Sequence, residues 1–313
     1  MKVDLSTENP RQGEKKCLSY GGPDEELDEL SSRNGMERLK EDIEELKREI
    51  KRIWAHLSLG GAPPEVALKK RGFRLASSCP QAGLIYPQAE GEVEKFYEHM
   101  KRYSFRLLLR DIVKLANGFC KDDLTHYCSL EAVSTYLGFL LAAGIIEERG
   151  KGVYGLLPVV DNFGGTLEWF VAQVFRREFA SPASWGIRLL ETEQGGDYDV
   201  IAQVEGRIVY VEVKSSPPKN IYQEMVGEFL SRTQELRPNL AIFLTDTHLR
   251  LEDKINKLFK WELEKRGRGT VEMERLREGI FSLGKGIMII NSKPDLVANL
   301  AFCLRHFFGF LDR

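Results

Sequence analysis

Residues 195–216, GGDYDVIAQVEGRIVYVEVKSS, predict the β-hairpin on which the fold depends. Segments 199–204 and 207–215 are rich in Val, Ile and Tyr, and the turn signal Glu205-Gly206 lies between them. A loop of two residues, or one of four, produces the same register between the two strands. We therefore expect an antiparallel pair in which facing residues follow directly from the sequence.

The register of this hairpin brings charged side chains together. It places Asp199 directly opposite Glu212, and directly opposed like charges destabilise a sheet unless something bridges them. Because side chains alternate along a strand, Tyr210, Glu212 and Lys214 share one face, and the valines that alternate with them point to the other. We expect an active face and a separate, apolar core face.

Two carboxylates and an ammonium group are the parts of a metal-assisted hydrolytic site. Mg²⁺ takes oxygen ligands from one or two carboxylates, from water and from substrate phosphate. The bound ion lowers the pKa of water and stabilises charge on a phosphoryl oxygen, while a nearby ammonium group orients the attacking water or helps to deprotonate it. The alternative is a solvent-facing hairpin whose polar residues merely alternate.

At these residues the sequence resembles the PD-(D/E)xK nuclease superfamily, the fold of many restriction endonucleases and archaeal Holliday-junction resolvases. The matching pattern is Asp199 followed by Glu212-Val213-Lys214, with Glu168 at the place of the family's upstream helical glutamate. The resemblance implies that Asp199, Glu212 and Glu168 bind Mg²⁺, for which Mn²⁺ can substitute. It also implies that Lys214 serves the attacking water.

The resemblance covers roughly residues 162–247. It implies an α/β fold with a restriction-endonuclease-like α-β-β-β-α-β core and a mixed sheet, within a nuclease-like domain at 161–313. Tyr198 stands where the family often has proline, and Asp197 is a second acidic candidate, either in a loop or as an outer ligand. The expected elements are a helix with the buried stripe Leu167, Phe170, Val171, Val174 and Phe175, strands 185–190, 240–245 and 286–291, and helices 221–236, 251–266 and 296–310.

Residues 101–160 resemble a winged helix-turn-helix domain. The expected elements are helices over 105–116, 122–128 and 129–143, and two short strands around a glycine turn within 145–155. Such a domain either docks on DNA through its third helix or has a structural or dimer-forming role, and both alternatives stay open.

Five basic residues are candidates for contact with a nucleic-acid backbone. Arg149 and Lys151 lie at the expected wing, and Lys69, Lys70 and Arg71 form a cluster further upstream. The alternative for such a short run of charge is a solvated surface.

Three residues could suggest zinc, namely Cys120, His126 and Cys128, but no second pair of ligands accompanies them. We expect them to be buried helix residues.

The amino-terminal region has two parts. Residues 1–24 are polar and rich in Gly and Pro, and we expect a disordered tail. Within 25–59, apolar residues at alternating three- and four-residue steps over 36–57 form about three heptads, which predict a coiled-coil helix and a homodimer. The alternative is one amphipathic helix docked on its own domain. Residues 60–100 are expected to be a linker region.

The composition sets limits on the class of protein. Net charge is −2 and the pI is about 6.3, so no global basic field indicates nucleic acid. Five cysteines without regular spacing favour reduced thiols in a cytosolic compartment. No apolar run reaches the roughly 20 residues that span a bilayer, so we expect no membrane partner and a cytoplasmic location.

The sequence thus predicts a Mg²⁺-dependent nuclease that hydrolyses phosphodiester bonds in DNA. We expect a structure- or site-directed endonuclease that acts as a dimer, with a place in DNA repair. The alternative is a non-catalytic DNA-binding or assembly protein that uses the winged helix and keeps the nuclease fold as a scaffold. Cleavage of RNA would use the same metal chemistry.

Overall fold

The computed structural model describes residues 38–40, 42–43, 45–47, 61–115, 118–157, 160–193, 195, 197–267 and 272–311. The chain divides into two compact units, 1–54 and 55–313. The predicted tail at 1–24 lies outside the described residues, as does most of the predicted coiled-coil segment. The described part of that segment is helical and exposes Leu39, Ile43 and Leu46, so the coiled coil and the homodimer stay predictions.

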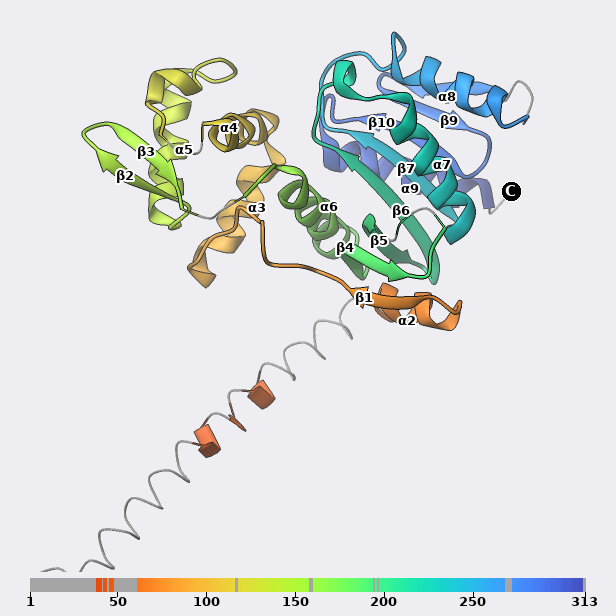
Figure 1. Cartoon of the computed structure of the whole chain (residues 1–313), viewed down its shortest axis with the longest axis horizontal. Helices are drawn as coiled ribbons and strands as arrows, with labels where there is room; N and C mark the ends of the chain where they lie inside the picture. Colours follow the sequence, from red (N-terminus) through yellow and green to blue (C-terminus); the bar gives the residue numbers. More distant parts are fainter. Residues whose placement is uncertain are drawn as a thin grey trace, which may run out of the picture. The chain divides into compact units, whose positions relative to one another are not determined.

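An eight-stranded mixed sheet dominates the second unit (Figure 1). Its strand order is β1-β4-β5-β6-β7-β10-β9-β8, in which β6 with β7 and β7 with β10 are parallel and the other pairs are antiparallel. The strands are β1 (Arg74–Ser77), β4 (Ala183–Leu190), β5 (Asp197–Val204), β6 (Arg207–Lys214), β7 (Leu240–Thr245), β8 (Met273–Arg277), β9 (Ile280–Leu283) and β10 (Ile287–Asn291). The chain is therefore an α/β protein.

Helices cover both faces of this sheet and enclose two hydrophobic cores. On one face lie α6 (Gly164–Glu178) and α9 (Leu296–Leu311), and on the other α7 (Gln223–Leu236) and α8 (Ile255–Lys265). The apolar stripe predicted for α6 is fully buried. The order α6-β4-β5-β6-α7-β7 confirms the predicted α-β-β-β-α-β succession of elements.

A smaller, mainly helical part lies between β1 and β4 in the chain. It contains α3 (Val93–Lys101), α4 (Tyr103–Lys114), α5 (Leu130–Ala142) and the two-stranded sheet of β2 (Ile146–Gly150) and β3 (Val153–Leu156). Ser129 caps α5 by accepting a hydrogen bond from the backbone of Ala132 at 3.3 Å, as its position before an apolar run favours. The predicted third helix and the strand pair after it are confirmed as elements.

The helix expected at 122–128 is wrong. The chain forms a 3-10 turn at Lys121–Leu124, followed by irregular turns. The Asp123 carboxylate accepts a hydrogen bond from the Cys120 backbone at 2.7 Å, and such local side-chain bonds compete with a helix. Cys120 and His126 are exposed and Cys128 is half-buried, so the expectation that these are buried helix residues is also wrong.

The segment expected to be a linker contributes to the folded unit. It contains α2 (Pro64–Lys70), β1 and α3, and β1 pairs with β4 at one edge of the sheet. Leu68 of α2 is fully buried in the core under α7 and α8.

A buried ion pair joins the helical part to the sheet. Nε and Nη2 of Arg106, in α4, donate to the two carboxylate oxygens of Asp246 at 2.9 and 2.8 Å, directly after β7. Both side chains are buried, at 1% and 0% exposure, and Arg110 pairs with the same carboxylate. Burial raises the pKa of Asp246, but the two guanidinium charges outweigh it and lower this pKa to about 2.

Candidate active site

The hairpin of β5 and β6 has the register that the sequence predicts. The regular pairing runs from Val204–Arg207 to Val200–Val211, and the predicted pair of Asp199 opposite Glu212 lies one residue beyond it. Glu205 and Gly206 both have positive φ, at 49° and 74°, as the two central residues of a type I′ turn require. The two-residue loop is thus the observed one, and it fixes which residues of the two strands meet.

Asp199 occupies a point where the sheet departs from regular alternation. Tyr198 packs in the core under α7 and α8, whereas Val200 packs in the core under α6, although residues two apart on a regular strand share a face. On the neighbouring strand, Gly186 has φ of +52°, a conformation that suits glycine. Asp199 reaches across to β6, where its Oδ2 accepts a hydrogen bond from the Val213 backbone at 2.7 Å.

Glu212 lies in the interior of the protein, with 0% exposure. Lys214 donates to its Oε1 at 2.7 Å, Nη1 of Arg232 lies 3.3 and 3.4 Å from its two oxygens, and the Tyr210 hydroxyl donates to Oε2. The expected clean separation of an active face from a core face is wrong, because Tyr210 is fully buried under α7 on the face that carries Glu212. The sequence had not singled out Arg232 or a role for Tyr210.

The electrostatic field of these groups keeps both cations charged. Burial lowers the pKa of Lys214, but the charges of Glu212 and Asp199 outweigh it, so the net shift is upward. Burial also lowers the pKa of Arg232, but Glu212, Tyr210 and Asp199 together outweigh it, so the net shift is upward. Lys214 is therefore an ammonium donor at neutral pH.

The same surroundings favour the neutral, protonated forms of Glu168 and Asp199. Burial, and then the charge of Glu212, raise the pKa of Glu168 to about 7. Burial, followed by the charges of Glu212 and Glu168, raises the pKa of Asp199 well above its usual value. Three carboxylates thus repel one another at the end of the hairpin, and the structure brings together the four residues that the sequence singled out.

The chemistry of this donor set suits a hard divalent cation, although the ligands are not gathered around one point. Within the part of the chain that the structure describes, no three His, Cys, Asp or Glu side chains are grouped in a geometry that could hold a metal ion. The oxygens of Glu212 are already bonded to Lys214 and Arg232. Burial first, and then the neighbouring carboxylates, raise the pKa of Asp199 and of Glu168, and a bound cation would favour the ionised form of both.

The remaining acidic candidate lies at the edge of this cluster, and its charge also raises the pKa of Glu168. Asp197 is exposed and forms a long ion pair with Arg188, at 3.6 Å.

The predicted basic residues have different surroundings. Nη1 of Arg71 donates to the backbone carbonyls of Leu236 and Arg237 at the end of α7, at 3.1 and 3.0 Å, which gives it a structural role. Lys69 and Lys70 are exposed on α2.

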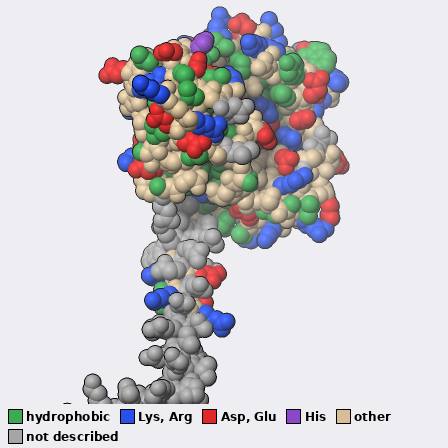
Figure 2. Space-filling model, turned by 60° about the vertical axis from the view of Figure 1, so that its left-hand side comes forward, with side chains coloured by type: hydrophobic (Ala, Val, Ile, Leu, Met, Phe, Trp, Pro, Cys, Tyr) green, Lys and Arg blue, Asp and Glu red, His purple; other side chains and the backbone are tan. Residues whose placement is uncertain are grey.

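At the predicted wing the positive charge is partly balanced. Arg149, on β2, pairs with Glu147 at 2.9 Å, and Lys151 is exposed in the turn that follows. The face of the molecule in Figure 2 likewise shows Lys and Arg intermixed with Asp and Glu, without a broad basic field.

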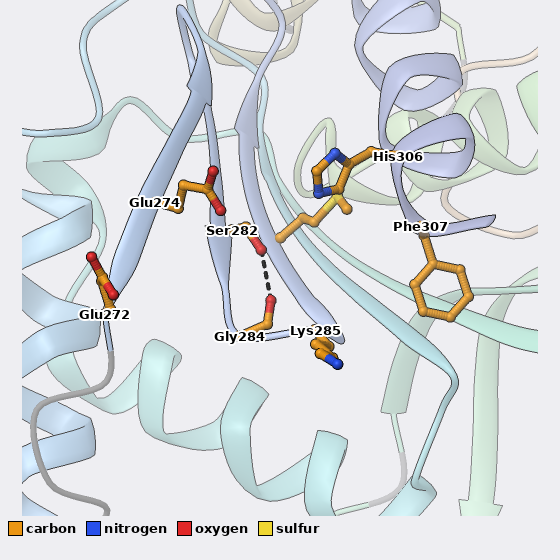
Figure 3. Close-up of a pocket in the computed structure, with 8 residues that line it drawn as sticks. Glu272, Glu274, Ser282, Gly284, Lys285, His306 and Phe307 are labelled. Carbon is orange, nitrogen blue, oxygen red and sulfur yellow. Dashed lines mark hydrogen bonds between the residues drawn. The ribbon is translucent and has the colours of Figure 1, made fainter. Parts of the chain in front are cut away.

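A hollow of about 470 Å³ at the β8 edge of the sheet is separate from this site (Figure 3). Its lining residues include Glu272, Glu274, Lys285 and His306. None of the three carboxylates of the candidate site, Glu168, Asp199 and Glu212, is among them. The hollow has no connection with the candidate chemistry.

Comparison with known proteins gives a weak likeness in fold. No protein-family model and no curated protein matches the chain. Among solved structures, protein VC1899 from Vibrio cholerae is similar, with 15% identity, a TM-score of 0.42 and coverage of 71% of this chain and 57% of that one. Can2 from Sulfobacillus thermosulfidooxidans, in complex with cyclic tetra-adenylate, is similar with 14% identity, a TM-score of 0.41 and coverage of 76% and 58%.

The chain thus spans somewhat more than half the length of each of these two proteins. At these TM-scores the two similarities carry no inference about the fold or the site of this chain. Among the described residues, no helix has the length and apolar character to cross a membrane.

Proposed function

We propose that the protein is a Mg²⁺-dependent nuclease that hydrolyses phosphodiester bonds in DNA. The observation that carries the proposal is the cluster of Glu168, Asp199 and Glu212 around Lys214, at the end of the β5–β6 hairpin. Mutually repelling, buried carboxylates cost stability, and such groups occur most often where a site performs chemistry. The resemblance of the same four residues to the PD-(D/E)xK pattern supports this reaction class.

Each residue of the cluster then has a role that follows from its surroundings. Asp199 and Glu168 would hold the ion, with Glu212 as a further ligand once it separates from Arg232. The ion, when bound, supplies charge stabilisation at the phosphoryl oxygen and acidifies a water molecule. Lys214, protonated at neutral pH, donates a hydrogen bond to the attacking water or to a phosphate oxygen and does not act as a base. Glu168 has a raised pKa of about 7 without the ion, and as a ligand it would release its proton when the ion binds.

DNA as substrate, a homodimer formed through residues 36–57 and a winged-helix role for the helical part complete the proposal. Arg149 and Lys151 of the wing, and Lys69 and Lys70 of α2, are the side chains that would contact phosphates. Cleavage as a step of DNA repair is the context that we propose for such an enzyme.

A second candidate function rests on one observation. Glu212 is neutralised by Lys214 and Arg232 within the protein itself, which is what a non-catalytic DNA-binding or assembly protein with a nuclease-like scaffold would show. Such a protein would bind DNA or a partner without any requirement for divalent metal.

A cleavage assay separates the two functions. Purified protein is incubated with Mg²⁺ or Mn²⁺ and with single-stranded, duplex and branched DNA and single-stranded RNA. We expect metal-dependent cleavage that Asp199→Asn and Lys214→Ala abolish. Asp197→Asn, which removes an exposed carboxylate two residues from Asp199, is the matched control and should keep full activity. Metal-independent binding without cleavage, unaffected by Glu212→Gln, would show that the second function is the correct one.

A further inference from the structure

A cleft of about 600 Å³ lies between the helical part and the sheet. Its walls are α4, the residues at the start of α6, and the segments that follow β6 and β7. β6 and β7 are parallel neighbours, so both enter the cleft at their carboxyl ends, the side at which open α/β sheets place their ligands. We call this space the helix–sheet cleft.

The helix–sheet cleft begins where the candidate active site ends. Ser215 and Ser216, which line it, directly follow Lys214 in the chain. Lys214 pairs with Thr245, and its carbonyl accepts a hydrogen bond from the Asp246 backbone at 2.9 Å, which holds the segments after β6 and β7 side by side. A strand of nucleic acid at Lys214 therefore has the cleft as its neighbour.

The side chains of the cleft suit a flat, uncharged group. Four ring-bearing residues line it: Tyr103, Tyr127, Phe163 and His248. The rings of Tyr103 and His248 stack with centroids 3.8 Å apart and an interplanar angle of 13°. Tyr127 exposes 57% of its surface. Aromatic rings of this kind are the stacking platforms on which proteins receive unpaired bases.

The polar groups of the cleft point to a ligand with hydrogen-bonding edges. Nε2 of His248 and Nε of Arg110 belong to lining residues, but both atoms are buried, without a hydrogen-bond partner in the described part of the chain, and do not form the surface that a ligand meets. The polar residues of the lining that a ligand can meet are Ser215, Ser216 and Asn220. A nucleobase carries both donors and acceptors on its rim and can meet such groups.

The charges of the cleft argue against a phosphate as its main occupant. Arg110 is already paired with Asp246, and Lys114 with Asp111 at 2.7 Å. Asp161 adds a further negative charge to the lining. A phosphate would find each of these cations neutralised, whereas a neutral base is indifferent to that balance.

We propose that the helix–sheet cleft holds one unstacked nucleobase of the strand whose phosphodiester lies at Lys214. The inference rests on the proposed nuclease function and deepens it, because it assigns single-stranded or locally unpaired nucleic acid as the substrate class. A free nucleotide offers the same base chemistry, so the test includes it as a separate source.

The test measures binding by fluorescence anisotropy with the full chain carrying Asp199→Asn, which prevents cleavage. Two dye-labelled single-stranded oligonucleotides of equal length and charge are compared, one with bases and one with an abasic sugar–phosphate backbone. We expect the base-bearing strand to bind about tenfold more tightly, within the range that one base–aromatic stack supplies. Tyr127→Ala and His248→Ala should each reduce this preference to under about threefold and leave binding of the abasic strand unchanged.

The controls distinguish this inference from its alternatives. Tyr222→Ala removes a similarly exposed tyrosine, at 55%, that does not line the cleft, and it should keep the preference. Tyr127 belongs to neither hydrophobic core, so a loss of the preference for the base-bearing strand in Tyr127→Ala would not reflect a loss of folding. Competition by adenosine or thymidine monophosphate that is lost in His248→Ala would assign the same site to a free nucleotide.

Two results would overturn the base site: equal affinity of the unsubstituted cleft for both strands, or a base preference that survives both cleft substitutions. Neither result affects the nuclease proposal, which depends on cleavage by the wild-type chain and its loss in Lys214→Ala. Conversely, a base preference without any metal-dependent cleavage would keep the cleft as a binding site and refute the nuclease.

Discussion

Removing the charge of Asp246 should separate the helical part from the sheet. In Asp246→Asn the guanidinium groups of Arg106 and Arg110 stay buried, at 1% and 13% exposure, without a counter-charge. Breaking a buried ion pair by removing one partner costs roughly 3–5 kcal/mol. The shift of the Asp246 pKa to about 2, from an unfolded value near 3.9, corresponds to roughly 2–3 kcal/mol and supports the lower end of that range.

Urea denaturation at pH 7, followed by circular dichroism, measures this change. We expect the free energy of unfolding to fall by about 3 kcal/mol in Asp246→Asn. The matched control is Asp111→Asn, which removes a pair with Lys114 on the same helix; the side chain of Lys114 is 70% exposed and that of Asp111 15%, and the change should cost under about 1 kcal/mol. The reasoning would be refuted by a loss of less than about 1 kcal/mol in Asp246→Asn, or by equal losses in both variants.

The pH dependence has a definite sign. A carboxyl group whose folded pKa is depressed stabilises the protein fully above its unfolded pKa, and the contribution disappears as pH falls through the folded pKa. The stabilisation by Asp246 should therefore be complete above about pH 5 and decline between about pH 4 and pH 2. The difference between wild type and Asp246→Asn should shrink over this window.

Three other expectations follow from the site and its surroundings. Glu168→Gln should raise the free energy of unfolding by about 2–3 kcal/mol at pH 8, where an ionised Glu168 is costly, and change it little at pH 5; urea titrations at both values measure this, and an equal effect at both would contradict it. Binding of Mg²⁺ to the wild type, measured by calorimetry, should strengthen as pH rises through about 7 because protonated Glu168 cannot bind the ion, and an unchanged pH dependence in Glu168→Gln would exclude Glu168 as a ligand. Arg71→Ala should cost about 1–3 kcal/mol in denaturation because two carbonyls at the end of α7 lose their donor, whereas Lys70→Ala, on the adjacent exposed residue, should be neutral.

The sequence could predict the hairpin register because it depends on local properties. Alternation with a period of two, together with Glu205-Gly206 as the turn, determines which residues of β5 and β6 face each other. The strand β7 and the apolar stripe of α6 could also be predicted, since continuous or periodic apolar patterns specify buried elements.

Other features could not be predicted because they depend on contacts between distant segments. The pairing of Arg232 with Glu212 requires the placement of α7 over β6, and the change of face at Asp199 requires knowledge of Gly186 on a different strand. The edge strands β1 and β8 have short sequences of exposed and half-buried residues without alternation, so no pattern distinguished them from loops. Arg71 carried the charge expected of a phosphate ligand, yet its partners are backbone carbonyls more than 160 residues away.

The position of β6 in the sheet has a consequence for the dynamics of the site. β6 is the fourth of eight strands, hydrogen-bonded on both sides and covered on both faces, so its amide protons should exchange with solvent among the slowest in the chain. We therefore expect the backbone at Glu212 and Lys214 to open only with global unfolding. A rearrangement that frees Glu212 for a ligand should then involve the side chains bonded to it, Tyr210, Lys214 and Arg232, and the helix α7 that carries Arg232, and hydrogen exchange that increases in α7 alone on addition of Mg²⁺ would reveal it.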